Sequence, residues 1–533
     1  MSELDIGLKE NIAKRRTFAI ISHPDAGKTT LTEKLLLYSG MIHTAGMVRG
    51  RKGRKAAASD WMAMEQERGI SITASAMQFI YKDSVINVLD TPGHEDFSED
   101  TYRTLTAADC AIMVIDAAKG VEKQTRKLFE VCRLRRIPVL TFINKMDMPG
   151  REPLDLMNEV ENVLQIQSSA MNWPIGIGRD FTGVYDRVAR ECLIFTKTSV
   201  GGAQKAEISR YSIEAPEIKN LLGAEGQEKL GQELELLDLA GNSFSRDEFL
   251  AGGITPVFFA SALTNFGIEP FFDAFIHLAP SPQARLADRL GGEEFSIDPL
   301  AHSFSAYVFK IQANMDKRHR DSMAFLRVCS GKFERDLVVK HHRLGREVRL
   351  SRPHGMVAGE RTTLDAAYAG DIIGVINPGV FSVGDTISLT GGFNFKPLPQ
   401  FQPEIFARVS PKDIGKRKSF DKGILQLTEE GAIQILRPYD LSGDLIFAAV
   451  GQLQFEVMQY RLRDEYQVET IVTPLPYQCS AWLLGNFDTF QKTSTSMIVQ
   501  DRWERPMVLF GEQWEKQYAI KQNPDHQLVD ILA

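Results

Sequence analysis

The sequence predicts a multidomain α/β and β protein, in which an α/β domain with a mostly parallel sheet precedes an antiparallel β-barrel domain and an α+β domain. The chain has 533 residues, and at roughly 100 to 200 residues per domain this length predicts about three or four domains. Apolar runs alternate with helix-like stretches over residues 17–280. Shorter alternating runs with glycine-rich turns follow over 302–392, as in a small antiparallel barrel.

The first domain contains five apolar runs rich in Val, Ile and Phe, which predict strands buried on both faces. The stretch Val121–Arg136 carries apolar residues at the i, i+3, i+4 and i+7 spacing of an amphipathic helix. Because strands and helices alternate, we expect a mostly parallel sheet with flanking helices over 1–285. The five runs are Thr17–Ser22, Val85–Asp90, Cys110–Asp116, Ile137–Asn144 and Pro256–Ser261.

Two segments have the composition of domain boundaries. Ala279–Gln283 (APSPQ) and the charged stretch after it predict a linker. The proline-containing stretch Phe395–Pro403 predicts a second boundary. We therefore expect three domains, over 1–285, 300–395 and 396–533, the last of which reads as strand, helix and strand.

The composition is that of an ordinary soluble protein, with a formal net charge of -7, 25% charged residues and 43% apolar residues. No 18 uncharged apolar residues stand together, and the N-terminus lacks the apolar segment of a secretory signal. We therefore expect a cytoplasmic protein that binds no membrane. The five cysteines lack CxxC or CxxH spacing, so the sequence predicts buried thiols and neither a disulfide framework nor a zinc site.

A loop with the features of a phosphate-binding loop, Ser22–Thr30 (SHPDAGKTT), follows the first predicted strand. Such a loop needs converging backbone N–H groups, a glycine, a lysine that reaches the outer phosphates and a hydroxyl for Mg²⁺. Gly27, Lys28 and Thr29 supply the last three, although Ser22 replaces the first glycine of the usual pattern. Taken alone, the same letters also fit the simple start of a helix. The candidate nucleotide-binding residues here are Ser22, His23, Pro24, Asp25, Ala26, Gly27, Lys28, Thr29 and Thr30.

A second predicted strand ends in Asp90–His94, which reads DTPGH. A carboxylate at a strand end beside a phosphate loop can hold Mg²⁺ through water, and the Gly93 N–H can contact a terminal phosphate. A plain Thr-Pro-Gly turn with a solvated His94 is the alternative explanation. Asp90 and Gly93 are therefore candidates for binding Mg²⁺ and phosphate, and the neighbouring motifs decide between the two explanations.

The segment Asn144–Asp147 (NKMD) closes another predicted strand and matches the edges of guanine. An amide and a carboxylate three residues apart fit the O6/N7 acceptors and the N1–H/N2–H₂ donors of guanine, an arrangement that adenine lacks. Loss of paired hydrogen bonds in a buried site costs about 1 to 3 kcal/mol each, so Asp147 alone can separate guanine from adenine by roughly ten- to a hundredfold. A polar strand cap is the alternative for Asn144 alone. Backbone donors to guanine O6 are expected after the last strand, from Ser261, Ala262 and Leu263.

These four elements occur in order, each at the carboxyl end of a predicted buried strand, where open α/β sheets bind their ligands. Together with Arg68–Ser71 (RGIS), the set resembles the translational GTPases. The longer phrases ISHPDAGKTT, SDWMAMEQERGISIT and DTPGHEDFSEDTYRTLTAADC are similar to the bacterial class II peptide chain release factors. The similarity extends over essentially the whole chain and is strongest in residues 1–150, which implies a P-loop GTP-binding domain followed by a translation-factor barrel.

The resemblance implies a GTP hydrolase that is stimulated by the ribosome and acts in translation termination. It implies GTP and GDP as ligands, Mg²⁺ as cofactor, and the ribosome, with its RNA and proteins, as partner. We then expect the protein to promote dissociation of the stop-codon-reading class I release factors after peptide release, and to act as a monomer. A tRNA-delivering or translocase-like GTPase, and a nucleotide-gated binding module without catalysis, are the alternatives.

The resemblance assigns three residues to catalysis by their position. Lys28 would bind the β and γ phosphates, Asp25 would lie in the phosphate loop near the metal, and His94 would orient the attacking water. Pro24 and Ile70 would form an apolar gate on either side of His94.

The resemblance also implies that Thr29 and Ser71 are ligands of Mg²⁺, with Asp90 holding the ion through water. Many relatives carry a threonine where Ser71 stands, but a serine hydroxyl can also coordinate, and Thr73 is a substitute. Lys145 would lie along the nucleotide ring.

Three basic clusters are candidates for contacts with ribosomal RNA, because lysine and arginine bind backbone phosphates. The alternative explanation for each cluster is an ordinary solvated loop. The clusters are Arg49–Lys55, Lys317–Arg320 and Lys412–Lys418.

Overall fold

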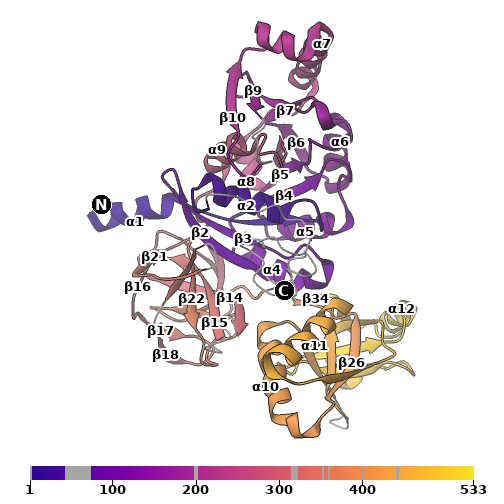
Figure 1. The fold of residues 1–533 in the computed structure, drawn as a ribbon. Coiled ribbons are helices and arrows are strands. Elements are labelled where there is room, and N and C mark those ends of the chain that lie inside the picture. Colours follow the sequence, from indigo (N-terminus) through magenta and orange to yellow (C-terminus); the bar gives the residue numbers. More distant parts are fainter. Residues whose placement is uncertain are drawn as a thin grey trace.

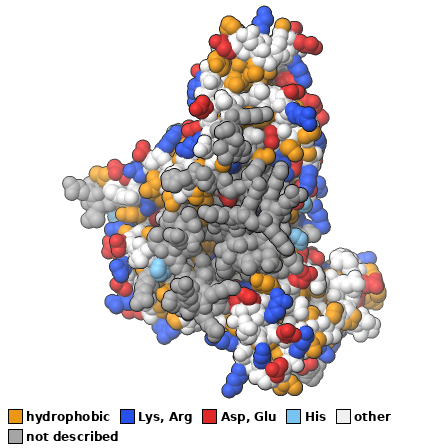
Figure 2. Space-filling model, viewed as in Figure 1, with side chains coloured by type: hydrophobic (Ala, Val, Ile, Leu, Met, Phe, Trp, Pro, Cys, Tyr) orange, Lys and Arg blue, Asp and Glu red, His pale blue; other side chains and the backbone are white. Residues whose placement is uncertain are grey.

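An α/β domain lies at one end of the molecule, with a β-barrel domain and an α+β domain beside each other below it (Figure 1). The structure is a computed structural model, and no helix among the residues it describes is long and apolar enough to cross a membrane. On the face seen in Figure 2, the described Lys, Arg, Asp and Glu side chains are intermixed over both ends of the molecule. The structure describes residues 3–42, 74–196, 202–313, 322–350, 353–357, 360–398, 400–439, 443–485 and 487–532.

The first domain is built on a seven-stranded sheet in the order β2-β3-β1-β4-β5-β11-β6. Every neighbouring pair is parallel except β2 with β3, which confirms the mostly parallel sheet. The strands are β1 (Arg15–Ser22), β2 (Ser75–Tyr81), β3 (Ser84–Asp90), β4 (Cys110–Asp116), β5 (Val139–Asn144), β6 (Gln167–Ala170) and β11 (Ile254–Phe259).

Helices cover both faces of this sheet, so the side chains of each central strand alternate between two apolar cores. Phe18 and Ile20 of β1 belong to one core, and Ala19 and Ile21 belong to the other. This explains why the strands read as unbroken apolar runs. The helices are α1 (Glu3–Ala13), α2 (Lys28–Tyr38), α4 (Ser98–Thr106), α5 (Lys123–Leu134), α6 (Pro153–Leu164), α8 (Arg246–Ala251) and α9 (Ile268–Leu278), with the 3₁₀ turn η1 (Glu95–Phe97) before α4.

An antiparallel extension that the sequence did not predict lies at the far end of this domain (Figure 1). It forms a four-stranded sheet in the order β10-β9-β8-β7, with the helical segment α7 (Pro216–Ala240), which is kinked at Gly223, beside it. The strands have only four to six residues, which leaves little periodicity to detect. They are β7 (Asn172–Ile175), β8 (Gly183–Asp186), β9 (Glu191–Thr196) and β10 (Glu207–Tyr211).

The second domain is an antiparallel sheet of eight strands that encloses its own apolar core, in the order β18-β17-β23-β14-β15-β22-β19-β20. A two-stranded sheet, β16 (Lys332–Glu334) with β21 (Ala366–Tyr368), lies beside it. The eight strands are β14 (Ser305–Ala313), β15 (Ser322–Ser330), β17 (Val338–His341), β18 (Arg346–Arg349), β19 (His354–Val357), β20 (Glu360–Thr363), β22 (Ile372–Ile376) and β23 (Thr386–Ser388).

The segment that the composition predicts as a linker contains two strands. β12 (Arg285–Arg289) and β13 (Glu294–Ile297) pair with each other, and β12 also pairs with β24 (Phe393–Phe395). Ala287 and Ile297 are buried, whereas the charged residues between them face outward. A strand with one solvated face carries alternating polar residues, which is why its composition resembles that of a linker.

The third domain is α+β, with an eight-stranded antiparallel sheet in the order β29-β26-β28-β27-β31-β32-β30-β33. The predicted helix over 452–466 is α11 (Gln452–Tyr466), flanked by strands as expected. The elements are β26 (Ile405–Pro411), β27 (Gln434–Pro438), β28 (Ile446–Ala449), β29 (Thr470–Pro474), β30 (Cys479–Leu484), β31 (Met497–Gln500), β32 (Pro506–Phe510), β33 (Gln527–Val529), α10 (Arg417–Glu430) and α12 (Gln513–Gln522), with β25 (Gln400–Phe401) pairing with β34 (Ile531–Leu532).

All five cysteines are free and buried, as the sequence predicts. Burial raises the pKa of the Cys132 thiol to about 12, and it also raises the pKa of the Cys110 thiol well above its ordinary value. These thiols therefore remain protonated at neutral pH and pack as small apolar side chains.

Candidate nucleotide-binding site

The loop between β1 and α2 has the backbone geometry of an anion-binding loop. Gly27, the residue before α2, has a φ of 98°, and Asp25 has a φ of 66°. Left-handed residues in such a loop turn successive N–H groups toward one point, and the N-terminus of α2 adds its positive dipole end there. A Cβ atom at Gly27 would lie 2.2 Å from Nδ2 of Asn144, so only glycine fits this position.

Lys28 and Asp90 lie together because β1 and β3 are parallel neighbours whose carboxyl ends are in register, with Ile20 opposite Asp90. The Lys28 Nζ atom lies 2.6 Å from Oδ1 of Asp90, and both side chains are almost completely buried, at 6% and 2% exposure. Asp90 Oδ2 is also buried and has no hydrogen-bond partner among the described residues. The pair therefore supplies an ammonium group and a carboxylate oxygen directly beside the loop.

The loop after β3 lies against the phosphate-binding loop. The Thr91 hydroxyl donates to the carbonyl of Ile20 at 2.7 Å, which holds the start of the DTPGH segment on β1. A Cβ atom at Gly93 would be 3.5 Å from the backbone of Pro24, so these two loops are in van der Waals range. The Gly93 backbone thus lies directly beside this loop.

Asn144 joins the phosphate loop to the two segments predicted to bind guanine. Its Nδ2 donates to the carbonyl of Ala26 at 2.8 Å, and its Oδ1 accepts from the N–H of Ala262 at 2.9 Å. Asn144 is 2% exposed, so these hydrogen bonds are shielded from water. One side chain at the end of β5 therefore fixes the relative positions of three loops that are distant in the sequence.

Asp147 and Lys145 are the next candidates for contact with the base. The Asp147 carboxylate has an unpaired oxygen, and the Lys145 side chain is held by an ion pair. Asp147 Oδ1 is buried and has no hydrogen-bond partner in the described part of the chain. Buried polar atoms nearly always have a hydrogen-bond partner, so an unpaired carboxylate oxygen at this loop indicates that a bound ligand donates a hydrogen bond to it. Lys145 has a φ of 68°, and its Nζ lies 2.8 Å from Oδ2 of Asp116, which holds the lysine stem beside this loop. Ser261 is buried, whereas Leu263 is 37% exposed.

His94 lies at the end of the DTPGH segment with its side chain 37% exposed. Its Nδ1 atom is 3.3 Å from the backbone nitrogen of Asp96 and 3.4 Å from the Oδ1 atom of the same residue. These contacts engage the Nδ1 edge of the imidazole, which leaves Nε2 as the nitrogen available to a water molecule.

The residues present fit a magnesium ion. Among the described residues, no group of three or more His, Cys, Asp or Glu side chains could hold a metal. Mg²⁺ is usually bound by one or two protein oxygens together with waters and substrate phosphates, so a dense protein cluster is not required. The orphaned Oδ2 of Asp90 and the hydroxyl of the partly exposed Thr29 are hard oxygen donors of the required kind.

Several predicted residues lie outside the described residues. These include Ser71, Thr73 and Ile70, and the basic clusters Arg49–Lys55 and Lys317–Arg320.

The third basic cluster, Lys412–Lys418, lies between β26 and the start of α10. Lys412 pairs with Glu469 at 2.9 Å, and Arg417 pairs with Asp421 at 2.9 Å. Part of its charge is therefore already balanced within the domain.

Sequence reasoning assigned no role to two acidic residues that contact the site. Asp116 ends β4 and holds Lys145, and Glu122 Oε1 lies 3.2 Å from Nε2 of His23 in the phosphate loop. Asp116 could have been found by the argument used for Asp90, because it too ends a buried strand at the same sheet edge. Glu122 has no such signal, because it does not end a strand but directly precedes α5.

Three family models match consecutive parts of the chain. The elongation factor Tu GTP binding domain matches residues 13–281, and elongation factor G domain 2 matches residues 303–390. The C-terminal domain of class II release factor RF3 matches residues 395–520.

Full-length relatives and a solved structure are also similar to this chain. A peptide chain release factor 3 from Synechocystis sp. is 52% identical over 515 residues, which cover 96% of this chain and 93% of that protein. One from Symbiobacterium thermophilum is 51% identical over 523 residues, which cover 97% of each. A crystal structure of a protein from Thermus thermophilus has the same fold, with a TM-score of 0.69 and 19% identity over 92% of this chain and 72% of that chain. This chain, whose site residues resemble those of the translational GTPases, therefore belongs to the peptide chain release factor 3 family.

Proposed function

We propose that this class II release factor GTPase hydrolyses GTP on the ribosome and thereby promotes dissociation of class I release factors after peptide release. The observation that carries the proposal is the position of Asn144, whose side chain ties the phosphate loop to the proposed guanine-binding segments through hydrogen bonds of 2.8 Å and 2.9 Å. A single ligand with a phosphate tail and a purine base matches this junction. Membership of the family supports the termination step.

In this proposal the phosphates are held by the loop from Ser22 to Thr30. Its N–H groups and the Lys28 ammonium would face the phosphate oxygens, because both belong to the N-terminus of α2 or the turn before it. Thr29 and Asp90 would hold Mg²⁺, Asp90 through water, and Ser71 is the further proposed ligand. When bound, Mg²⁺ neutralises negative charge that develops on the phosphate oxygens.

The hydrolytic step is an in-line attack of water on the γ phosphorus, in which a new P–O bond forms and the bond to the β–γ bridging oxygen breaks. His94 would hold the water through Nε2, since its Nδ1 edge already contacts Asp96. Lys28 would stabilise charge on the β and γ phosphates, with Asp25 beside the metal. Such a site depends on positioning, so we expect slow hydrolysis by the isolated protein and fast hydrolysis with ribosomes.

His94→Ala tests this assignment. GTP binding should survive, because the proposed role of His94 is to hold the attacking water and not the nucleotide, whereas ribosome-stimulated hydrolysis should fall by at least about two orders of magnitude. Single-turnover phosphate release with ribosomes, with ATP as the control nucleotide, measures the effect. An unchanged stimulated rate would remove His94 from the mechanism.

Asp147→Asn tests the guanine assignment. The carboxylate accepts from the N1–H and N2–H₂ groups of guanine, whereas an amide can donate to the C2 carbonyl that xanthine carries at that position. We expect GTP affinity to fall by roughly ten- to a hundredfold and xanthosine triphosphate to bind better than to the unmodified protein. Equal GTP affinity in competition binding would show that Asp147 does not read the base.

The termination role is tested on ribosomes that have released their peptide and still hold a class I factor. We expect GTP and this protein to accelerate loss of that factor, and GDP to fail. If the protein instead protects aminoacyl-tRNA from hydrolysis, the alternative of a tRNA-delivering factor holds.

The proposal includes the division into domains over 1–285, 300–395 and 396–533, a cytoplasmic location and a monomeric state.

A further inference from the structure

The loop that carries His94 is joined to the C-terminal domain by one side chain. Asp96 Oδ2 accepts a hydrogen bond from the backbone N–H of Leu453 at 2.6 Å, across 357 positions of sequence. Asp96 Oδ1 lies 3.4 Å from Nδ1 of His94. The two oxygens of one carboxylate thus face the imidazole and the start of α11.

Asp96 takes the place of the missing cap of α11. A helix N-cap side chain usually accepts from the N–H of the second or third helical residue. The N-cap of α11 is Gly451, which has no side chain, and Leu453 is the second helical residue. The Leu453 N–H would normally bond to a capping side chain of the C-terminal domain. Here it bonds to Asp96 of the first domain instead.

The fit leaves no room for any other residue at Gly451. A Cβ atom there would lie 2.0 Å from Cγ of Asp96 and 2.1 Å and 2.3 Å from its two oxygens. The φ of Gly451 is -145°, which any residue adopts, so the obstacle is steric, and the three nearest atoms all belong to the Asp96 carboxylate. Beside this contact, Phe97 packs with Leu453 and Val457 in an apolar cluster that spans both domains.

We propose that Asp96 is a positioning residue that couples the orientation of His94 to docking of the N-terminus of α11. While α11 is docked, its N–H fixes Asp96, whose own backbone N–H donates to Nδ1 of His94 at 3.3 Å and whose carboxylate lies beside the same edge of the imidazole. Movement of the C-terminal domain away from η1 releases the carboxylate and with it the imidazole. The inference rests on the proposed role of His94 in hydrolysis.

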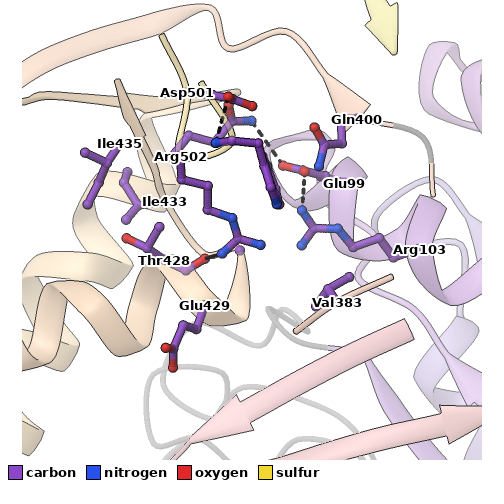
Figure 3. A pocket seen from close by; sticks show the side chains of 13 residues that line it. Glu99, Arg103, Val383, Gln400, Thr428, Glu429, Ile433, Ile435, Asp501 and Arg502 are labelled. Carbon is purple, nitrogen blue, oxygen red and sulfur yellow. Dashed lines mark hydrogen bonds and ion pairs between the residues drawn. The ribbon is translucent and has the colours of Figure 1, made fainter. Parts of the chain in front are cut away.

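Glu99 provides a matched control, because it belongs to the same interface and its carboxylate is engaged by other residues. Its carboxylate on α4 pairs with Arg103 and accepts from Gln434 Nε2 at 3.3 Å. Figure 3 shows Glu99 and Arg103 pointing into a pocket that Arg502 and Thr428 of the C-terminal domain also line. Glu99→Gln keeps the size and an acceptor oxygen, so it perturbs the interface and leaves the Asp96 contacts in place.

The test is a double-mutant cycle in the full chain, with ribosome-stimulated single-turnover hydrolysis and GTP affinity as readouts. We expect Asp96→Ala and Gly451→Ala each to lower the rate about tenfold, while GTP affinity stays within about twofold, because loss of position without loss of binding acts on kcat. Since Asp96→Ala removes the group that the new Cβ atom would meet, the double variant should be within about twofold of Asp96→Ala alone. Asp96→Asn keeps an acceptor oxygen for Leu453 and should recover most of the loss in rate.

Three results would overturn the proposal: a rate for Gly451→Ala within about twofold of the unmodified protein, multiplicative losses of about a hundredfold in the double variant, or a tenfold loss in Glu99→Gln as well. Hydrogen exchange of the amides over 94–106 provides an independent readout. It should rise in Gly451→Ala and not rise further in the double variant. If His94→Ala leaves hydrolysis unchanged, the proposed function of His94 fails, and this exchange experiment still decides whether the coupling exists.

Discussion

At the scale of single residues, the site depends on atoms whose hydrogen-bonding capacity the protein leaves unused. Asp90 Oδ2 and Asp147 Oδ1 are both buried without a hydrogen-bond partner among the described residues. The desolvation of such an oxygen is costly unless a ligand satisfies it. The two atoms therefore mark the ends of the proposed ligand, a metal with phosphates at Asp90 and a base at Asp147.

Gly27 is the residue where the smallest change should have the largest effect. In Gly27→Ala, the added methyl group would meet Nδ2 of Asn144 at 2.2 Å, and a φ of 98° is unfavourable for alanine. We expect GTP affinity to fall by at least about tenfold, since the clash displaces the side chain that joins the three loops. Equilibrium binding of a fluorescent GTP analogue measures this loss.

Gly252→Ala provides the control for Gly27→Ala. Gly252 also has a positive φ, of 79°, but a Cβ atom there meets nothing within 4 Å. It should therefore cost some stability and leave GTP affinity unchanged. Equal affinity losses in both variants would show that backbone strain, and not the contact with Asn144, is responsible.

At the scale of elements, helix α2 buries charged residues that its sequence pattern does not explain. Glu33 and Lys34 are each only 4% exposed. Lys34 Nζ donates to the carbonyl of Gly202, and Lys205 Nζ donates to the carbonyl of Tyr38 at 3.0 Å. A segment 168 positions away thus covers the polar face of α2, and burial lowers the pKa of Lys34 to about 8 from its ordinary value of 10.5.

This burial predicts how stability depends on pH. Because the pKa of Lys34 is lower in the folded protein, the unfolded chain binds more protons between pH 8 and pH 10.5, so stability should rise with pH in this window. The shift corresponds to about 3 kcal/mol in the free energy of unfolding. Lys34→Met should remove the rise, as measured by urea denaturation at several pH values. Lys119→Met, at a lysine that is 45% exposed, should leave the slope unchanged.

At the scale of the whole molecule, the first two domains are joined by buried ion pairs. Arg327 Nη2 of the barrel lies 2.5 Å from Oδ2 of Asp109, with exposures of 1% and 0%. Arg15 Nε lies 2.8 Å from Oδ2 of Asp371, at 8% and 3% exposure. The C-terminal domain contacts both members of this pair of domains, since Glu430 Oε1 accepts from the N–H of Ala313 in the barrel at 2.9 Å and Asp96 Oδ2 accepts from the N–H of Leu453 at 2.6 Å.

Asp109→Ala should strongly destabilise the interface between the first domain and the barrel. It leaves the buried guanidinium of Arg327 without its carboxylate, and breaking a buried ion pair by removing one partner costs about 3 to 5 kcal/mol. The midpoint of urea denaturation, followed by circular dichroism, should fall accordingly. Asp421→Ala removes the exposed pair with Arg417, at 55% and 62% exposure, and should cost less than about 1 kcal/mol. Equal effects would contradict the assignment of this interface.

The sequence by itself determined the order of the domains, the central parallel sheet and the loops of the site. These features are local: a strand buried on both faces is a continuous apolar run, and a ligand loop stands directly after it. Cys110–Asp116 therefore has the predicted bounds, and Asn144 and Asp90 lie at strand ends as expected.

Only the tertiary structure decided which polar groups meet across long distances in the sequence, between domains or within one. The contacts of Asp96 with Leu453, of Arg327 with Asp109 and of Lys34 with Gly202 join residues more than 160 positions apart. No periodicity or spacing within one segment encodes such a pairing, because each partner reads as an ordinary polar residue in its own segment. Their energies arise from burial, and burial exists only once the second element covers the first.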